Sequence, residues 1–196
     1  MKPTDRMLLQ LLSAAINAQN PTLDRALSDS EWNLVYGQAA KQGVLAVMWE
    51  SVRRLPQDLQ LVRSLKLQWA YGVEQIVSRS KRQMQEAARF AALCADAGCR
   101  LILLKGIGLS RYYPVPLQRE CGDIDILLPE GFEIGNEIAK SHGMTISGLD
   151  YKHNHIYSNG IMFENHRYLT SFKGKNDIRR LEKICLLYTS PSPRDA

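Results

Sequence analysis

Two aspartates one residue apart, Asp123 and Asp125, lie within an apolar run that ends at Leu128. Side chains in a β-strand alternate between its two faces, so a strand here would project both carboxylates from the same face. The flanking Ile124 and Ile126 indicate that at least one face of this strand is buried, where two like charges are costly without a cation. Carboxylate oxygens beside substrate phosphates are a typical environment for Mg²⁺. The pair therefore predicts a Mg²⁺ site.

Spacing alone does not decide this, because 20 acidic residues in 196 positions produce such pairs by chance. A second pair, Asp29 and Glu31, flanks an expected helix start, where capping and the helix dipole favour carboxylates. The alternative for Asp123 and Asp125 is an edge strand on which both carboxylates are solvated. The choice between these interpretations depends on the residues that the fold brings nearby.

A glycine-rich segment precedes the aspartates and runs from Lys105 through Gly106 and Gly108 to Ser110. Glycines between a strand and a helix let backbone N–H groups approach a phosphate, and the helix N-terminus adds partial positive charge. Lys105 and the later Arg119 can neutralise phosphate charge. The segment matches neither the P-loop pattern nor the full dinucleotide-binding fingerprint. The alternative is a tight turn with solvated basic side chains and an ordinary helical serine.

A β-hairpin is predicted around Asn159-Gly160, because this dipeptide between two strand-like runs is a strong turn signal. The register of a two-residue turn places His155 opposite Glu164. The same register places His153 opposite His166, on the same face of the hairpin. The hairpin thus gathers three imidazoles and a carboxylate.

This face of the hairpin has three interpretations that the sequence leaves open. Glu164 can be a third metal-binding carboxylate, with the histidines in outer contact with the metal or in contact with an acceptor substrate. Alternatively, His153, His155, His166 and Glu164 form a zinc site. The third interpretation is the ordinary polar outer face of a sheet.

The elements that position these residues change character near Gly98. Before it, apolar spacing predicts helices at about 5–18, 30–41, 43–54 and 57–97. The last helix ends before Gly98, because a glycine in the left-handed conformation commonly terminates a helix. After it, the pattern predicts strands at about 100–105, 122–128 and 144–148, the hairpin, and helices at about 106–113 and 130–142. We therefore expect an α+β fold, with an all-helical N-terminal region followed by a small mixed sheet and flanking helices.

Composition sets the outer bounds. With 45% hydrophobic and 23% charged residues, the chain can bury a core as one domain or two small ones. The net charge of +5 is spread without a basic block, and a nucleotide's phosphates need far less positive charge than nucleic acid does. Cys94, Cys99, Cys121 and Cys185 show no metal or disulfide spacing, which favours reduced thiols in the cytoplasm. The N-terminus reads as an amphipathic helix rather than a signal peptide, and no apolar run approaches a membrane span.

Several short motifs, taken in order, resemble a known family. They are Leu103-Leu104-Lys105-Gly106, Tyr112-Tyr113-Pro114, Arg119, Gly122-Asp123-Ile124-Asp125-Ile126-Leu127 and Glu164-x-His166. This series is similar to the uncharacterised nucleotidyltransferase family of the polymerase-beta-like superfamily. The resemblance covers about residues 100–170 and implies a minimal nucleotidyltransferase core at 99–173, after a helical region at 1–98.

The resemblance also implies roles for residues. Asp123 and Asp125 would bind divalent metal, Glu164 would supply the third carboxylate, and Lys105, Gly106 and Gly108 would face the triphosphate. One departure from the superfamily is that its usual Gly-Ser pair in this loop is replaced by Gly106-Ile107-Gly108. The family normally continues into a C-terminal helical region. We expect 174–185 to be the start of a truncated form of that region, and 186–196 to be a non-native tail.

The implied reaction is Mg²⁺-dependent transfer of a nucleoside monophosphate from an NTP such as ATP to an acceptor hydroxyl, with two Mg²⁺ ions bound. The acceptor, which could be a protein, a small molecule or RNA, is not identified by any motif. A non-catalytic nucleotide-binding or antitoxin-like regulatory module is the competing class, since a fold does not fix a function. A zinc hydrolase that uses His153, His155 and His166 is the third class.

Overall fold

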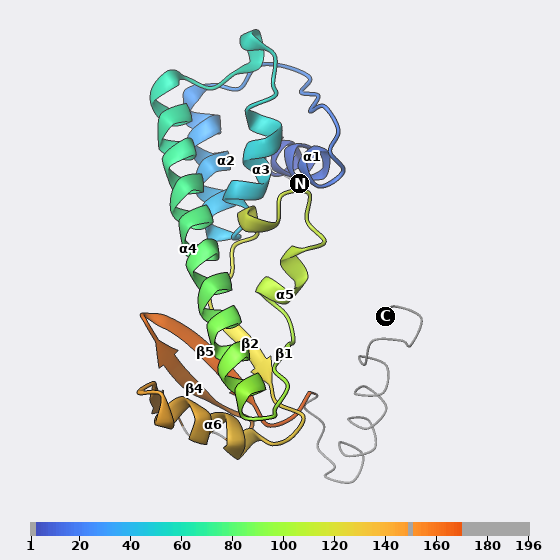
Figure 1. Cartoon of the computed structure of the whole chain (residues 1–196). Helices are drawn as coiled ribbons and strands as arrows, with labels where there is room; N and C mark the ends of the chain where they lie inside the picture. The colour runs from blue at the N-terminus through green and yellow to red at the C-terminus, as the bar shows by residue number, and fades with distance from the viewer. Residues whose placement is uncertain (1–2, 149–150, 170–196) are drawn as a thin grey trace. The chain divides into compact units, whose positions relative to one another are not determined.

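The structure is a computed structural model that describes residues 3–148 and 151–169 (Figure 1). The chain divides into two compact units, which are described separately. Unit 1 comprises Met1–Gln83 and Ile107–Gly122, and unit 2 comprises Met84–Gly106 and Asp123–Ala196. The segments predicted at 174–185 and 186–196, and Cys185, lie outside the described residues. The sequence-based boundaries at residues 98 and 173 stay predictions.

Unit 1 is helical, as the apolar spacing predicts. Its helices are α1 (Pro3–Ile16), α2 (Asp29–Lys41), α3 (Leu45–Val52), the first part of α4 (Arg63–Asp96) and the short α5 (Ile107–Ser110), with 3-10 turns η1 (Gln57–Leu59) and η2 (Pro116–Gln118). The start of α2 is fixed by a capping box, in which the Ser28 hydroxyl accepts from Glu31 N and the Glu31 carboxylate accepts from Ser28 N. The acidic pair at 29 and 31 therefore belongs to a helix start, as predicted.

The core of unit 1 is built around Trp69 on α4. Its side chain is fully buried, and its indole N–H donates to the carbonyl of Leu45 over 2.9 Å. The rings of Trp32 and Tyr36 meet it edge-on at centroid distances of 6.3 and 5.4 Å. Aromatic pairs in this geometry contribute beyond their buried area. Trp69 thus joins α2 and α3 to α4.

Unit 2 contains a five-stranded mixed sheet in the order β1-β2-β5-β4-β3 (Figure 1). The strands are β1 (Ile102–Leu103), β2 (Ile124–Leu127), β3 (Thr145–Ser147), β4 (His153–Ser158) and β5 (Ile161–His166). The neighbours β2 and β5 are parallel, whereas the other neighbouring strands are antiparallel. Helix α6 (Phe132–Ser141) follows β2. The α+β prediction with a small mixed sheet is confirmed.

The hairpin between β4 and β5 has the predicted turn and register. Asn159 and Gly160 both have positive φ, at 49° and 74°, which a two-residue turn of this kind requires. Pairing then brings His155 opposite Glu164 and His153 opposite His166. Because the register is confirmed, the three histidines and Glu164 share one face of the sheet.

The opposite face of the hairpin packs against helices. Phe163 of β5 meets Phe90 of α4 edge-on at 5.3 Å, and both side chains are fully buried. From α6, the side-chain oxygen of Asn136 accepts from the amides of Asn154 and Asn165, over 2.7 and 3.1 Å. Because α4 and α6 cover this face, the face that carries the histidines is the more open side of β4 and β5.

The hairpin tip is held to α4 by Glu86. One carboxylate oxygen accepts from Asn159 Nδ2, and the other accepts from Ser158 Oγ, both over 2.8 Å. Arg89 pairs with Glu86 and also donates to Ser158. Burial raises the pKa of Glu86, but the hydrogen bonds from Asn159, Ser158 and Arg89 outweigh it and leave that pKa lowered. Deprotonated Glu86 is therefore part of the folded unit.

We expect Glu86→Gln to destabilise unit 2 by about 1–2 kcal/mol at pH 7, because hydrogen bonds to a charged group are lost. A lowered pKa in the folded state contributes stability above the unfolded value of about 4.3, and this contribution is lost as pH falls through the folded value. The difference between the variant and the original chain should thus shrink below about pH 4. Thermal unfolding from pH 3 to pH 8 measures it. The exposed Glu137→Gln on α6 is the control, and an equal, pH-independent loss in both variants would contradict the role of Glu86.

The described cysteines, Cys94, Cys99 and Cys121, are buried and form no disulfide. Burial, with the nearby Cys99 and Glu130, raises the pKa of the Cys94 thiol to about 11. A buried thiol that stays protonated behaves as a small apolar side chain.

Within residues 3–148 and 151–169, no helix combines the length and the apolar character needed to span a membrane.

Candidate functional site

The central feature of the site is Asp125, which lies directly opposite Glu164 on the adjacent parallel strand. All four residues of β2 are buried, and the Asp125 side chain is only 1% exposed, whereas that of Glu164 is 18% exposed. Burying a carboxylate is costly unless charges or hydrogen bonds compensate. The fold therefore has to supply partners for Asp125.

Two cationic or hydrogen-bonding side chains converge on one oxygen of Asp125. Lys105 Nζ and His166 Nε2 each lie 2.9 Å from Asp125 Oδ1. The backbone helps to place the lysine, because Leu104 N donates to the Asp125 carbonyl over 3.1 Å just beyond β1. Positive charge is therefore favoured in the space next to Asp125 Oδ1.

Lys105 is a protonated cation at this position. The hydrogen bond to Asp125 raises its pKa most, partial burial lowers it, and the charges of Asp125, Asp123 and Glu164 raise it further. Its side chain is nevertheless 59% exposed. A fixed positive charge that is also accessible to solvent can pair with an anionic ligand.

Glu164 presents its two oxygens to different histidines. Oε2 lies 3.3 Å from His166 Nε2, and Oε1 lies 3.8 Å from His155 Nε2. The ring of His153 is 5.5 Å from that of His155 and 5.4 Å from that of His166, centroid to centroid. The Glu164 carboxylate therefore lies between the imidazole rings of His155 and His166.

Two overlapping groups of candidate metal ligands result. One consists of Asp125, Glu164 and His166, and the other of His153, His155 and Glu164, with the ligand atoms of each group within 4.8 Å of one another. The first group offers two carboxylates, which suits a hard divalent cation. The residues present in this structure thus fit a Mg²⁺ ion at the first group.

Asp123 belongs to neither group among the residues that the structure describes. It is half-buried and precedes the first residue of β2, so strand pairing does not fix its side chain to the face of Asp125. Its charge acts on Lys105, as the pKa of that lysine shows. Its proposed role as a metal ligand stays a prediction.

The predicted phosphate-binding residues are divided between the two units. Lys105 and Gly106 belong to unit 2, and Gly108, Ser110 and Arg119 belong to unit 1. Gly106 has a φ of +57°, a conformation that favours glycine, whereas Gly108 lies within the one-turn helix α5. That these five residues bind the phosphates of one nucleotide together stays a prediction.

Within unit 1, Ser110 and Arg119 have partners of their own. The Ser110 side chain is buried, and its hydroxyl donates to the carbonyl of Ile107 over 2.7 Å. The Arg119 guanidinium stacks 5.6 Å from the Tyr113 ring centroid, and its Nη1 donates to Cys121 Sγ. Phosphate binding by either residue would have to compete with these contacts.

Sequence reasoning missed the contacts that hold Asp125. It assigned Lys105 to the phosphates and His166 to outer contacts of the metal or to an acceptor, without naming Asp125 as the partner of either side chain; in the structure both lie against the Asp125 carboxylate. The missing signal is the parallel pairing of β2 with β5, which joins segments distant in the sequence. Once that pairing is known, Asp125 lies opposite Glu164, and His166, two residues beyond Glu164 on the same face of β5, lies within reach of it.

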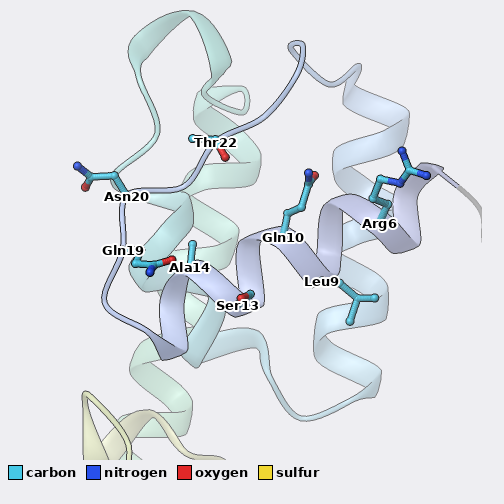
Figure 2. A pocket seen from close by; sticks show the side chains of 8 residues that line it. All are labelled: Arg6, Leu9, Gln10, Ser13, Ala14, Gln19, Asn20 and Thr22. Atoms are coloured by element: carbon cyan, nitrogen blue, oxygen red, sulfur yellow. The ribbon is translucent and has the colours of Figure 1, made fainter.

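Unit 1 also has an open hollow of about 370 Å³ along α1 (Figure 2). Its lining consists of Arg6, Leu9, Gln10, Ser13 and Ala14 from α1, and Gln19, Asn20 and Thr22 from the following loop. None of these eight side chains is a histidine or a carboxylate. The hollow can therefore hydrogen-bond a polar group but lacks the carboxylates and imidazoles that form the candidate metal-ligand groups of unit 2.

Comparison with known proteins gives a match to a family model. Searches of curated proteins and of solved structures find no match for this chain. A family model described as "Uncharacterised nucleotidyltransferase" matches residues 28–186, which include β2, β5 and all three histidines of the hairpin. Since this match spans most of the sequence, the chain belongs to the uncharacterised nucleotidyltransferase family.

Proposed function

We propose that the protein transfers a nucleoside monophosphate from an NTP to an acceptor hydroxyl in a Mg²⁺-dependent reaction that releases pyrophosphate. Membership of a nucleotidyltransferase family supports transferase chemistry in general. The observation that carries the specific proposal is the placement of Asp125 opposite Glu164 on neighbouring parallel strands. Two carboxylates in this arrangement, one buried and one accessible, suit a divalent ion that also binds phosphate.

In this proposal, Asp125, Glu164 and Asp123 hold two Mg²⁺ ions, with His166 beside them. The ions, when bound, neutralise charge on the phosphates and lower the pKa of the acceptor oxygen. Lys105 and His166 both lie 2.9 Å from Asp125 Oδ1, so the Lys105 ammonium group is held beside the carboxylates that would bind the ions. The exposed Lys105 is then placed to pair with NTP phosphates, with Gly106, Gly108, Ser110 and Arg119 as the remaining phosphate side.

The proposed bond changes are those of an in-line displacement at the α-phosphorus. The acceptor oxygen forms a bond to that phosphorus, the bond to the bridging oxygen of the β-phosphate breaks, and pyrophosphate leaves. We assign Glu164 as the acceptor of the hydroxyl proton. Its Oε1 lies 3.8 Å from the nearest histidine nitrogen, whereas Asp125 Oδ1 has two donors at 2.9 Å.

The competing proposal is a regulatory module that binds a nucleotide without turnover. It would use the same carboxylates and Lys105, because a fold does not fix a function. The two proposals differ in a measurable way, since only the enzyme releases pyrophosphate. We also propose that the protein acts in the cytoplasm, since the three cysteines that the structure describes form no disulfide.

We expect the full chain to bind at least one of ATP, GTP, CTP and UTP in calorimetry with Mg²⁺, and to lose that binding with EDTA. Incubating the bound nucleotide with protein, small-molecule and RNA acceptors should then release pyrophosphate in at least one case. Binding without pyrophosphate across the acceptor panel would favour the regulatory module. Absence of Mg²⁺-dependent binding to all four nucleotides would contradict both proposals.

A further inference from the structure

The two histidines of the second ligand group, His153 and His155, have no role in the proposed transfer reaction. We propose that His153, His155 and Glu164 form a binding site for a transition-metal ion of the Zn²⁺ or Co²⁺ class, separate from the Mg²⁺ site. Glu164 belongs to both ligand groups, with Oε1 toward His155 and Oε2 toward His166, so an ion in the histidine site would occupy the carboxylate oxygen assigned above as proton acceptor and lower the transfer rate. This site goes beyond the proposed function, which requires neither His153 nor His155.

The backbone register brings these ligands together. His155 pairs directly with Glu164 across the antiparallel strands, and His153 lies two residues earlier on the same face of β4. The ligand atoms of all three residues already lie within 4.8 Å of one another. In a tetrahedral site with bonds near 2.1 Å, ligand atoms are roughly 3.4 Å apart. Rotamer adjustments of about 1 Å would therefore close the site.

Gly148 leaves room for the His155 ring in its observed position. This glycine has a φ of +66°, and a Cβ built on it would lie only 3.0 Å from His155 Nδ1. The absence of a side chain at Gly148 thus leaves room for the Nδ1 side of the His155 ring. The other nitrogen, Nε2, is the one that faces Glu164 Oε1. The backbone therefore presents a defined nitrogen to the site.

The chemistry of the ligands separates the two sites. Mg²⁺ prefers oxygen ligands and keeps bound water, whereas imidazole nitrogens suit Zn²⁺, Co²⁺ and similar ions. Two imidazoles and one carboxylate are also a common protein ligand set for zinc with an open fourth position. The His155 side chain is 30% exposed, which leaves room for water or a substrate oxygen at that position.

The test is a titration of the full chain with Co²⁺ in the presence of excess Mg²⁺, followed by calorimetry and the visible absorption of bound cobalt. We expect one Co²⁺ to bind despite Mg²⁺. The double variant His153→Gln with His155→Gln should weaken binding by at least about 100-fold, because the loss of outer partners alone costs 10–100-fold. The control is His142→Gln, which changes a histidine that contacts the Ile138 carbonyl at the end of α6.

Thermal unfolding shows whether the double variant loses Co²⁺ binding or loses its fold. In EDTA the double variant should unfold at the same temperature as the original chain, and only the increase caused by Co²⁺ should disappear. The proposal is overturned if the original chain binds no Co²⁺, if the double variant binds it unchanged, or if His142→Gln weakens binding equally. It is also overturned if Asp125→Asn abolishes Co²⁺ binding while the double variant retains it. Pyrophosphate release with Mg²⁺ alone tests the transfer reaction independently.

Discussion

Asp125→Asn is expected to lower Mg²⁺-dependent pyrophosphate release by a factor of about 100 or more, the order of loss seen when a group that stabilises transition-state charge is removed. The substitution keeps the shape of the side chain and one acceptor oxygen, but removes the charge from the position where Lys105 and His166 converge. A neutral amide is a poor ligand for Mg²⁺ beside anionic phosphates. The measurement is the initial rate of pyrophosphate release at saturating NTP and Mg²⁺.

The fold should tolerate this change. Lys105 is largely exposed and can be solvated once its partner is neutral, and the amide oxygen of the variant can still accept from His166. Unfolding in EDTA should therefore show little difference. Asp29→Asn is the matched control, because it alters the other acidic pair, which belongs to the start of α2. Normal turnover by folded Asp125→Asn protein would contradict the proposed mechanism.

Features coded by adjacent residues could be predicted from the sequence. The hairpin register followed from Asn159-Gly160, whose positive φ angles are a local property of those two residues. The end of α4 followed from Gly98, which has a φ of +75°. Helix spacing and strand alternation are also local, so the change from a helical region to strands near Gly98 was visible in the sequence.

Features that depend on distant pairing could not be predicted from residue patterns. The adjacency of β2 and β5 brings Asp125 to Glu164, yet neither strand encodes its neighbour in its own residues. Glu164 became a candidate through the hairpin register, and the resemblance then implied its metal-binding role, while the direct contacts of Lys105 and His166 with Asp125 required the sheet order. The same limit applies to Asp123, since the strand expected to begin at 122 begins at Ile124. Strand alternation therefore cannot place its side chain.

Trp69→Ala is expected to destabilise unit 1 by about 3–5 kcal/mol through loss of buried area and creation of a cavity. The indole is fully buried against Trp32 and Tyr36, and the α3 carbonyl of Leu45 would lose its hydrogen-bond donor. Natural domains are stable by only about 5–15 kcal/mol, so this one change removes a large share.

The melting temperature of unit 1, followed by helical circular dichroism, should fall by at least about 12 °C, given 4–8 °C per kcal/mol for a unit of this size. The melting temperature of Trp69→Phe should lie between those of Trp69→Ala and the original chain, because phenylalanine keeps an aromatic ring but loses the N–H donor. Leu67→Ala, two residues earlier on α4 and 62% exposed, should stay within about 0.5 kcal/mol. If Leu67→Ala and Trp69→Ala lowered the melting temperature equally, helix propensity rather than packing on Trp69 would determine the stability of α4, and the assigned core of unit 1 would be wrong.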